Sequence, residues 1–301
     1  MEDADTAPIS GRKDQFKMKT TEKIALITGM NGFIGRHLAD FLFSKNIKVA
    51  GLPRELLFDP TALKGYIEEL KPNYIYHLAA AGNIQGRHTD DEIFISNIFG
   101  TYNLLTATKD IRYDAFINFS SLSVKLPVKT QYSATKLSAE YLCQVFAKNN
   151  NQPVVSVRPS TIYGEGEQSE HLIPTIIRNI RVDNSQPMKF VRSPLHDFLY
   201  VGDLVEAVYE LATKADKFAG QVVEIGSGVE YSNGEVLTIL EGFLGKLANI
   251  EEVESLRAYD TKLGWKVDKK GMKKLNWKYK TSLPEGLQKT VNWFLTNENT
   301  K

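Results

Sequence analysis

Short apolar runs alternate with longer amphipathic stretches along the first half of the chain. Five of these runs have the length and composition of strands buried on both faces, at residues 23–28, 47–51, 74–78, 115–120 and 154–157. The stretches between them space their apolar residues as helices do, at 33–43, 59–70, 92–109 and 131–148. This alternation predicts right-handed β-α-β units and a parallel, doubly wound sheet of the Rossmann type in the α/β class.

The second half of the chain has a different pattern, because the alternation weakens and short mixed elements follow. We therefore expect a Rossmann domain over residues 22–165 and a smaller C-terminal α/β lobe over 166–301. A strand within 196–206 is expected to return to the first domain. The polar residues 1–21 lack the apolar core of a signal peptide and predict a flexible leader.

Composition excludes several classes of function. The 301 residues are 42% hydrophobic and 24% charged with a formal net charge of +1, which gives no general attraction to nucleic acid or membranes. No apolar run approaches the roughly 20 residues that span a bilayer. The single cysteine, Cys143, and five histidines without ligand spacing predict no disulfide and no metal site. A reducing, cytoplasmic location is expected. The lysine-rich segment 262–280 is interpreted as a solvated surface around Trp265 and Trp277.

Three glycines lie between the first predicted strand and the first predicted helix. Gly29 permits a tight turn, Gly32 lets the backbone approach a pyrophosphate, and Gly35 lets the helix pack closely on the strand. The N-terminal N–H groups of that helix would then face the phosphates. This placement predicts dinucleotide binding.

Tyr132 and Lys136 are four residues apart at the start of a predicted helix, so their side chains share one face. The preceding strand ends at Ser120 and Ser121, on the sheet edge where ligands bind in such folds. A nearby ammonium is expected to lower the pKa of the phenol from about 10. Tyr132 is then expected to exchange a proton with a substrate oxygen that Ser121 stabilises.

With these features the chain resembles the extended short-chain dehydrogenase/reductases, the NAD-dependent epimerase/dehydratase group that acts on nucleotide sugars. The resemblance runs from about Lys23 to Phe294. Further stretches that carry it are His77–Ala80, Asn97–Thr101, Arg158–Gly164, His171–Pro174, Asp197–Asp203, Ile225–Gly228, Lys262–Trp265 and Leu283–Gly286.

The resemblance implies that the first domain binds the cofactor and that the C-terminal lobe binds the nucleotide sugar. The residues expected to contact the cofactor are Gly29, Asn31, Gly32, Phe33, Ile34, Gly35, Arg54, Leu78, Ala79, Ala80, Asn97, Tyr132, Lys136 and Pro159. The residues expected to contact the substrate are Ser121, Ser123, Arg192 and His196. For His196 a packed or solvated side chain is an equal alternative.

Two departures from the family pattern shape the expected reaction. The segment 48–54 contains no carboxylate for a ribose diol, and Arg54 is suited to a 2′-phosphate, which favours NADP over NAD. Dehydratases of the family carry an acid–base pair where this chain has Leu122 and Ser123, so dehydration is not expected.

The leading hypothesis is NADPH-dependent reduction of a nucleotide-linked 4-keto-6-deoxyhexose by Ser121, Tyr132 and Lys136. The alternative is 4-epimerisation of a nucleotide sugar with bound NAD, and a further alternative is a cofactor-binding scaffold without catalysis. The resemblance also implies a homodimer formed by the helices around 92–110 and 132–148.

Overall fold

The computed structural model describes residues 22–297 except Gln85, Val128, 183–185 and 256–264. The leader expected at 1–21 and most of the 262–265 motif therefore lie outside the described residues. Among the helices that are described, none is long and apolar enough to cross a membrane.

Six parallel strands form the larger sheet, in the order β2-β1-β3-β4-β5-β9. Their bounds are β1 (Ile24–Thr28), β2 (Lys48–Leu52), β3 (Tyr74–His77), β4 (Ala115–Phe119), β5 (Val154–Pro159) and β9 (Val222–Ile225). The chain goes from β1 to β2 on one side and then crosses β1 to reach β3. The strand order thus reverses between β1 and β3, which creates a crevice at their carboxyl ends.

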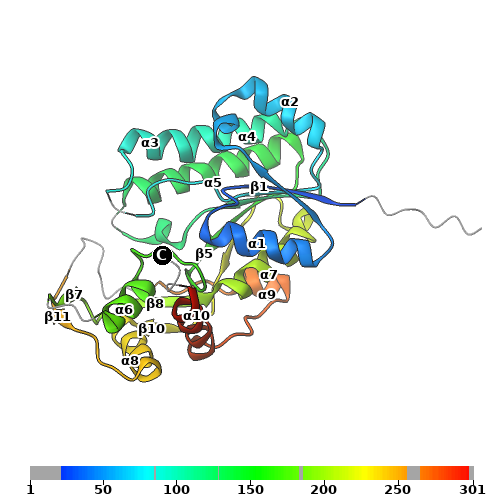
Figure 1. Ribbon diagram of the computed structural model, residues 1–301. Coiled ribbons are helices and arrows are strands. Elements are labelled where there is room, and N and C mark those ends of the chain that lie inside the picture. Colours follow the sequence, from blue (N-terminus) through cyan, green and yellow to red (C-terminus); the bar gives the residue numbers. More distant parts are fainter. Residues whose placement is uncertain (1–21, 85, 128, 183–185, 256–264, 298–301) are drawn as a thin grey trace, which may run out of the picture.

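Helices cover both faces of this sheet (Figure 1). One face packs against α2 (Pro60–Leu70), α4 (Gly100–Ala107) and α5 (Gln131–Asn150), and the other against α1 (Phe33–Ser44) and α7 (Val201–Ala212). The strands are buried between two apolar clusters, which explains their nearly continuous apolar sequence. The predicted doubly wound α/β fold is confirmed.

Shorter helical segments are η1 (Arg54–Phe58), η3 (Leu122–Lys125), η4 (Ala215–Phe218) and α9 (Lys270–Leu275).

The helix expected over 92–109 is interrupted. It begins earlier as α3 (Asp90–Phe94), because Thr89 and Glu92 form a capping box, and passes through a π-helical turn, η2 (Ile95–Phe99), into α4. A single π turn inside an α-helix is rare and occurs often at functional sites.

The smaller lobe has its own sheets and core. The three-stranded sheet has the order β10-β8-β6, with β6 (Thr161–Tyr163), β8 (Leu195–Tyr200) and β10 (Glu230–Ser232), and β7 (Met188–Phe190) pairs with β11 (Ile250–Glu252). Helices α6 (Leu172–Arg181), α8 (Asn233–Leu244) and α10 (Leu283–Asn297) enclose an apolar cluster with these strands.

The strand expected to return to the first domain within 196–206 is β8, and it does not join the larger sheet. It pairs with β6 and β10 instead. The chain returns through α7, which packs beside α1, and through β9, which pairs with β5.

Candidate functional site

The turn between β1 and α1 requires glycine at two of its three glycine positions. Gly29 has φ of 71°, and a Cβ there would lie 3.0 Å from Ala79 N. A Cβ on Gly35 would lie 2.3 Å from the carbonyl oxygen of Gly29, closer than any side chain tolerates. The turn is therefore a cradle of backbone that any larger residue would fill.

The start of α1 leaves backbone donors available at this turn. Gly32 is the N-cap residue, and no side chain in the described part of the protein caps the helix. The first N–H groups of a helix lack partners within the helix, and the helix dipole adds positive charge there. The observed geometry fits the pyrophosphate of a dinucleotide.

The carboxyl ends of β1, β3, β4 and β5 meet at one edge of the sheet, because these strands are parallel. The segment after β3 is held against β1, since Leu78 N donates to Thr28 O at 3.2 Å and Ala79 N to Thr28 Oγ1 at 3.0 Å. Pro159 is the buried last residue of β5 at the same edge. The expected cofactor contacts at 29–35, 78–80 and 159 thus lie along one edge of the sheet.

Ser121, Ser123 and Tyr132 are brought together just beyond β4. Ser123 Oγ donates to Ser121 Oγ at 2.9 Å, and Ser121 also accepts from Ser123 N at 3.2 Å. The Tyr132 phenol lies near enough to Ser121 for that hydroxyl to favour its charged form and so lower its pKa. Tyr132 follows Thr130, which caps the start of α5 with Ser133. A phenol and a hydroxyl therefore share one small polar site.

The pKa of Tyr132 differs from the expectation. Burial raises the pKa of the phenol above its usual value, and the Ser121 hydroxyl opposes this only in part. The predicted lowering by Lys136 is therefore wrong for the protein alone. Desolvation is the main cause of the Tyr132 shift, whereas the Lys136 charge acts on the pKa values of His77 and Cys143.

Lys136 lies one turn after Tyr132 on the same helix and is 3% exposed. Burial lowers the pKa of its ammonium to about 8, while Cys143 and Glu140 act in the opposite direction. Within the part of the chain that the structure describes, the ammonium forms no hydrogen bond or ion pair. A buried cation without a bonded partner is well suited to donate to ligand hydroxyls.

Asn97, at the centre of the π turn, joins three elements. Its Oδ1 accepts from Ala81 N at 2.8 Å, and its Nδ2 donates to Ala81 O at 3.0 Å and to Thr135 Oγ1 at 2.9 Å. The side chain thus connects the segment after β3, the π turn and α5. These contacts support the crevice and leave no donor hydrogen of the Asn97 amide for a ligand.

His77 belongs to a polar network that has no signal in the sequence. Its Nδ1 lies 2.8 Å from Thr28 Oγ1 and its Nε2 lies 3.0 Å from Thr101 Oγ1, and Thr101 donates to Asn97 O. Complete burial lowers the pKa of the imidazole to about 3, so the ring is neutral. The His77–Ala80 motif was noted as a family feature, but its partners are distant in sequence and only the fold reveals them.

Arg54 lies at the carboxyl end of β2, as the cofactor prediction requires. It begins η1, is exposed, and its charge contributes to the lowered pKa of Glu92. The guanidinium therefore remains open to a ligand at the end of the strand where a dinucleotide places its adenosine ribose.

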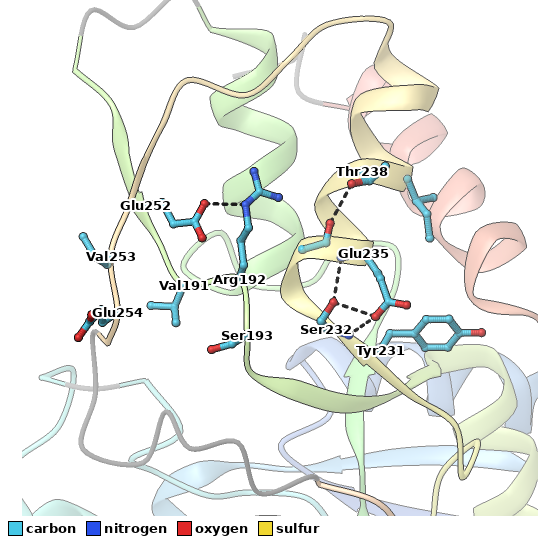
Figure 2. Close-up of a pocket in the computed structure, with 12 residues that line it drawn as sticks. Val191, Arg192, Ser193, Tyr231, Ser232, Glu235, Thr238, Glu252, Val253 and Glu254 are labelled. Atoms are coloured by element: carbon cyan, nitrogen blue, oxygen red, sulfur yellow. Dashed lines mark hydrogen bonds and ion pairs between the residues drawn. The ribbon is translucent and has the colours of Figure 1, made fainter.

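The smaller lobe contains a hollow of about 760 Å³ that Arg192 lines (Figure 2). Figure 2 shows its guanidinium beside Glu252, and Arg192 Nε lies 2.8 Å from Glu252 Oε2. Glu235 and Glu254 also line the hollow, so its charged groups are mainly acidic. The residues that line it include neither Ser121 nor Tyr132. Over the residues described, Arg192 forms its ion pair with Glu252 and none with Ser121, Ser123 or Tyr132.

His196 packs within the smaller lobe. Its ring centroid lies 5.3 Å from that of Trp265 and 5.6 Å from that of Phe198, and its Nδ1 lies 3.4 Å from Thr161 Oγ1. This environment is that of the packed alternative considered for His196.

Asp197 has a structural role that the sequence did not reveal. Its buried carboxylate accepts from Ser227 N and Gly228 N at 2.8 Å each, and from Ser227 Oγ at 2.7 Å. Burial raises the pKa of this carboxyl, although the four hydrogen bonds to it oppose the shift. Asp197 thus fixes the loop after β9 at the junction of the two sheets.

Over the residues described, no three His, Cys, Asp or Glu side chains gather as a metal site.

Comparison with known proteins identifies similar chains. Residues 25–226 match the model of the NAD dependent epimerase/dehydratase family. The UDP-glucuronate 4-epimerase of Thermodesulfobacterium geofontis is 27% identical, with 90% of this chain and 96% of that protein covered. The dTDP-glucose 4,6-dehydratase of Haemophilus influenzae is 25% identical, with 91% and 98% covered.

A solved structure with a similar fold is the UDP-glucuronic acid 4-epimerase from Bacillus cereus in complex with UDP-glucuronic acid and NAD. It is 26% identical, has a TM-score of 0.80, and the match covers 90% of this chain and 99% of that one.

Proposed function

Because the chain belongs to the NAD dependent epimerase/dehydratase family, we propose that it inverts a sugar carbon of a nucleotide sugar, using NAD. The observation that carries this proposal is the group formed by Ser121, Tyr132 and Lys136 at the carboxyl edge of the sheet, beside the glycine turn. The similar epimerases support inversion at C4.

The first domain, residues 22–165, is proposed to hold the dinucleotide. The N–H groups of 33–35 would bind its pyrophosphate, and the Lys136 ammonium would donate to its nicotinamide ribose. When bound, NAD supplies an acceptor and donor of hydride whose positive charge also favours the phenolate form of Tyr132.

Tyr132 is proposed to move the proton. Its Oη would accept the proton of the C4 hydroxyl as the C4 hydrogen passes as hydride to the bound cofactor, and Ser121 Oγ would donate to the same oxygen. After the ketone turns within the site, the hydride would return from the cofactor to the other face of C4 and Tyr132 would return the proton to the oxygen, which gives the alcohol of opposite configuration. The sugar is oxidised and then reduced, so the complete cycle has no net redox change.

Dehydration is not proposed for this chain. Eliminating water next to a ketone needs a general acid and a general base, and segment 121–123 supplies hydroxyls without a carboxylate. The lobe formed by 166–301 is proposed to hold the nucleotide. Arg192 and His196 remain predicted contacts there.

The test is product analysis with purified protein, NAD and a panel of UDP-glucuronate, UDP-glucose and dTDP-glucose. We expect one of these to yield its C4 isomer without a lasting change in absorbance at the NADH band. The Tyr132→Phe variant should bind NADH as the native protein does and form no isomer. Equal turnover by this variant would exclude the proposed role of Tyr132. No isomer with any substrate, together with no NADH binding, would reject the proposed function.

A second candidate function is NADPH-dependent reduction of a nucleotide-linked 4-keto-6-deoxyhexose, and Arg54 favours it. This arginine is exposed at the end of β2, and the segment 48–54 has no carboxylate to repel a 2′-phosphate. The raised pKa of Tyr132 also suits a phenol that begins as a proton donor. Consumption of NADPH with a keto sugar nucleotide, reduced by Arg54→Ala, would establish this reaction instead.

A homodimer is proposed through the exposed face of the helices near 92–110 and 132–148. Large apolar side chains are exposed there on η2, α4 and α5: Ile95, Phe99, Tyr102, Tyr141 and Val145. Such a patch on adjacent helices is typical of a surface that a partner covers. The occupant proposed is a second copy of this chain, because the face is formed by the helices that the family resemblance assigns to a dimer.

A further inference from the structure

A buried ion pair lies one helical turn beyond Lys136. Glu140 on α5 is 1% exposed. Arg158 on β5 donates to both of its oxygens, from Nε to Oε1 at 2.8 Å and from Nη2 to Oε2 at 2.6 Å. A two-point contact of this kind fixes both the position and the orientation of the carboxylate.

The ion pair continues into the segment that carries Ser121. Arg158 Nη1 lies 3.4 Å from Glu224 Oε1 on β9, and Lys125 Nζ lies 2.9 Å from Glu224 Oε2. Lys125 is the last residue of η3, and Ser121 is the N-cap of that segment. This series of ion pairs therefore joins α5 to the segment of Ser121 through two strands of the sheet, β5 and β9.

Glu140 is the negative charge that acts on Lys136. On the same helix, Tyr132 and Cys143 are neutral at pH 7 because burial raises the pKa of both. From β3, His77 faces Lys136 and is also neutral, with a pKa lowered to about 3. Arg158, on β5, carries a positive charge and is bonded to Glu140. Burial thus lowers the pKa of Lys136, and Cys143 and Glu140 oppose this; of these two groups, Glu140 is the one that carries a negative charge at neutral pH.

We propose that Glu140 and Arg158 are positioning residues for Lys136, in which Arg158 fixes the Glu140 carboxylate and the carboxylate keeps the Lys136 ammonium charged for cofactor binding. This inference rests on the proposed function, because it assigns to Lys136 the contact with the nicotinamide ribose. The pair touches neither the reacting atoms nor the cofactor in this account. It acts through Lys136 and through the orientation of α5.

Removing the negative charge of the pair and removing its positive charge should shift the pKa of Lys136 in opposite directions. Glu140→Gln removes the attraction and leaves Arg158 paired with Glu224 alone, so the ammonium should lose its proton at lower pH. Arg158→Met leaves the carboxylate uncompensated, so the ammonium should keep its proton to higher pH. A structural defect alone would weaken binding in both variants without this reversal of sign.

The experiment measures the NADH dissociation constant by fluorescence of the bound nucleotide between pH 6.5 and 10. Affinity of the native protein should fall as pH rises through the pKa of Lys136. We expect the midpoint to fall by about one pH unit in Glu140→Gln and to rise by about one unit in Arg158→Met. Glu69→Gln, which removes the same charge from an exposed position on α2, should leave the midpoint in place.

The outcomes separate this inference from the proposed function. The role of the pair would be overturned if Glu140→Gln had the same midpoint as Glu69→Gln. It would also be overturned if the midpoints of Glu140→Gln and Arg158→Met shifted in the same direction. In either case, NADH binding by the native protein would still support the proposed function. If Glu140→Gln does not fold, the direction of the shift in Arg158→Met decides the question alone. A native protein that binds no NADH would instead remove the proposed function.

Discussion

Asn97 and Thr135 form a 2.9 Å hydrogen bond that connects the π turn to the helix of Tyr132 and Lys136. The same Asn97 amide pairs with both backbone groups of Ala81. One buried side chain thereby determines the spacing between the segment after β3 and α5. Any cofactor between these elements depends on that spacing.

Replacing Asn97 by leucine should destabilise the protein by about 3 kcal/mol, because it leaves the N–H and C=O groups of Ala81 buried without partners. Urea unfolding measures this cost. Asn292→Leu on the exposed face of α10 is the matched control and should change stability by less than about 0.5 kcal/mol. Equal effects of the two variants would mean that the Asn97 contacts contribute nothing to stability.

Gly35→Ala should abolish NADH binding. Its Cβ would lie 2.3 Å from Gly29 O and 2.7 Å from Met30 O, so the turn that faces the pyrophosphate must shift. Gly65→Ala is the control, because a Cβ on this exposed residue of α2 has no atom within 4 Å. It should keep NADH affinity and stabilise the helix by roughly 0.5–1 kcal/mol. Titration with NADH tests both, and unchanged affinity in Gly35→Ala would contradict the role of the turn.

The sequence predicted the larger domain well because local patterns determine it. Strands buried on both faces and helices with one apolar face are visible as runs and periodicities, and the glycines at 29 and 35 are required by backbone geometry. The π turn at 95–99 was missed because it depends on Asn97 bonding to Ala81 and Thr135 rather than on local propensity.

Contacts between residues distant in sequence explain the other differences between the predictions and the structure. No local pattern in the sequence indicates that β8 pairs with β6 and β10. The prediction that this strand returns to the first domain is therefore wrong. The raised pKa of Tyr132 also depends on burial that spacing along a helix does not reveal. Residue types indicated the reaction class, whereas the choice between reductase and epimerase depends on ligand orientation. The similar proteins support the epimerase alternative better than the reductase that the sequence favoured.

His77 should make stability depend on pH. The imidazole pKa is about 3 in the folded protein and near 6.5 when unfolded, so the unfolded state binds more protons between these values. Its contribution is complete above pH 6.5 and is lost as pH falls toward 3, by about 2 kcal/mol between pH 6.5 and 5. Unfolding free energies of His77→Gln should fall less steeply over this range, and His88→Gln should retain the native slope. A native slope in His77→Gln would contradict the assignment.

The dimer should dissociate when charge is placed on its proposed face. Tyr141→Glu puts a carboxylate into the apolar patch on α5, and burying it unpaired would cost several kcal/mol. Light scattering should then report the mass of one chain. Phe43→Glu, at an exposed apolar position on α1 at the opposite face, should leave the native mass unchanged. A monomeric native protein would contradict the proposed dimer.

The most direct test of the account follows the hydrogen at C4 of the sugar. With a nucleotide sugar that carries deuterium at C4, mass spectrometry of the native reaction should show an inverted product that keeps the deuterium, no net change in NAD, and no product from Tyr132→Phe. A product that has exchanged this deuterium with solvent, or one formed equally by Tyr132→Phe, would contradict hydride transfer at the site of Ser121, Tyr132 and Lys136.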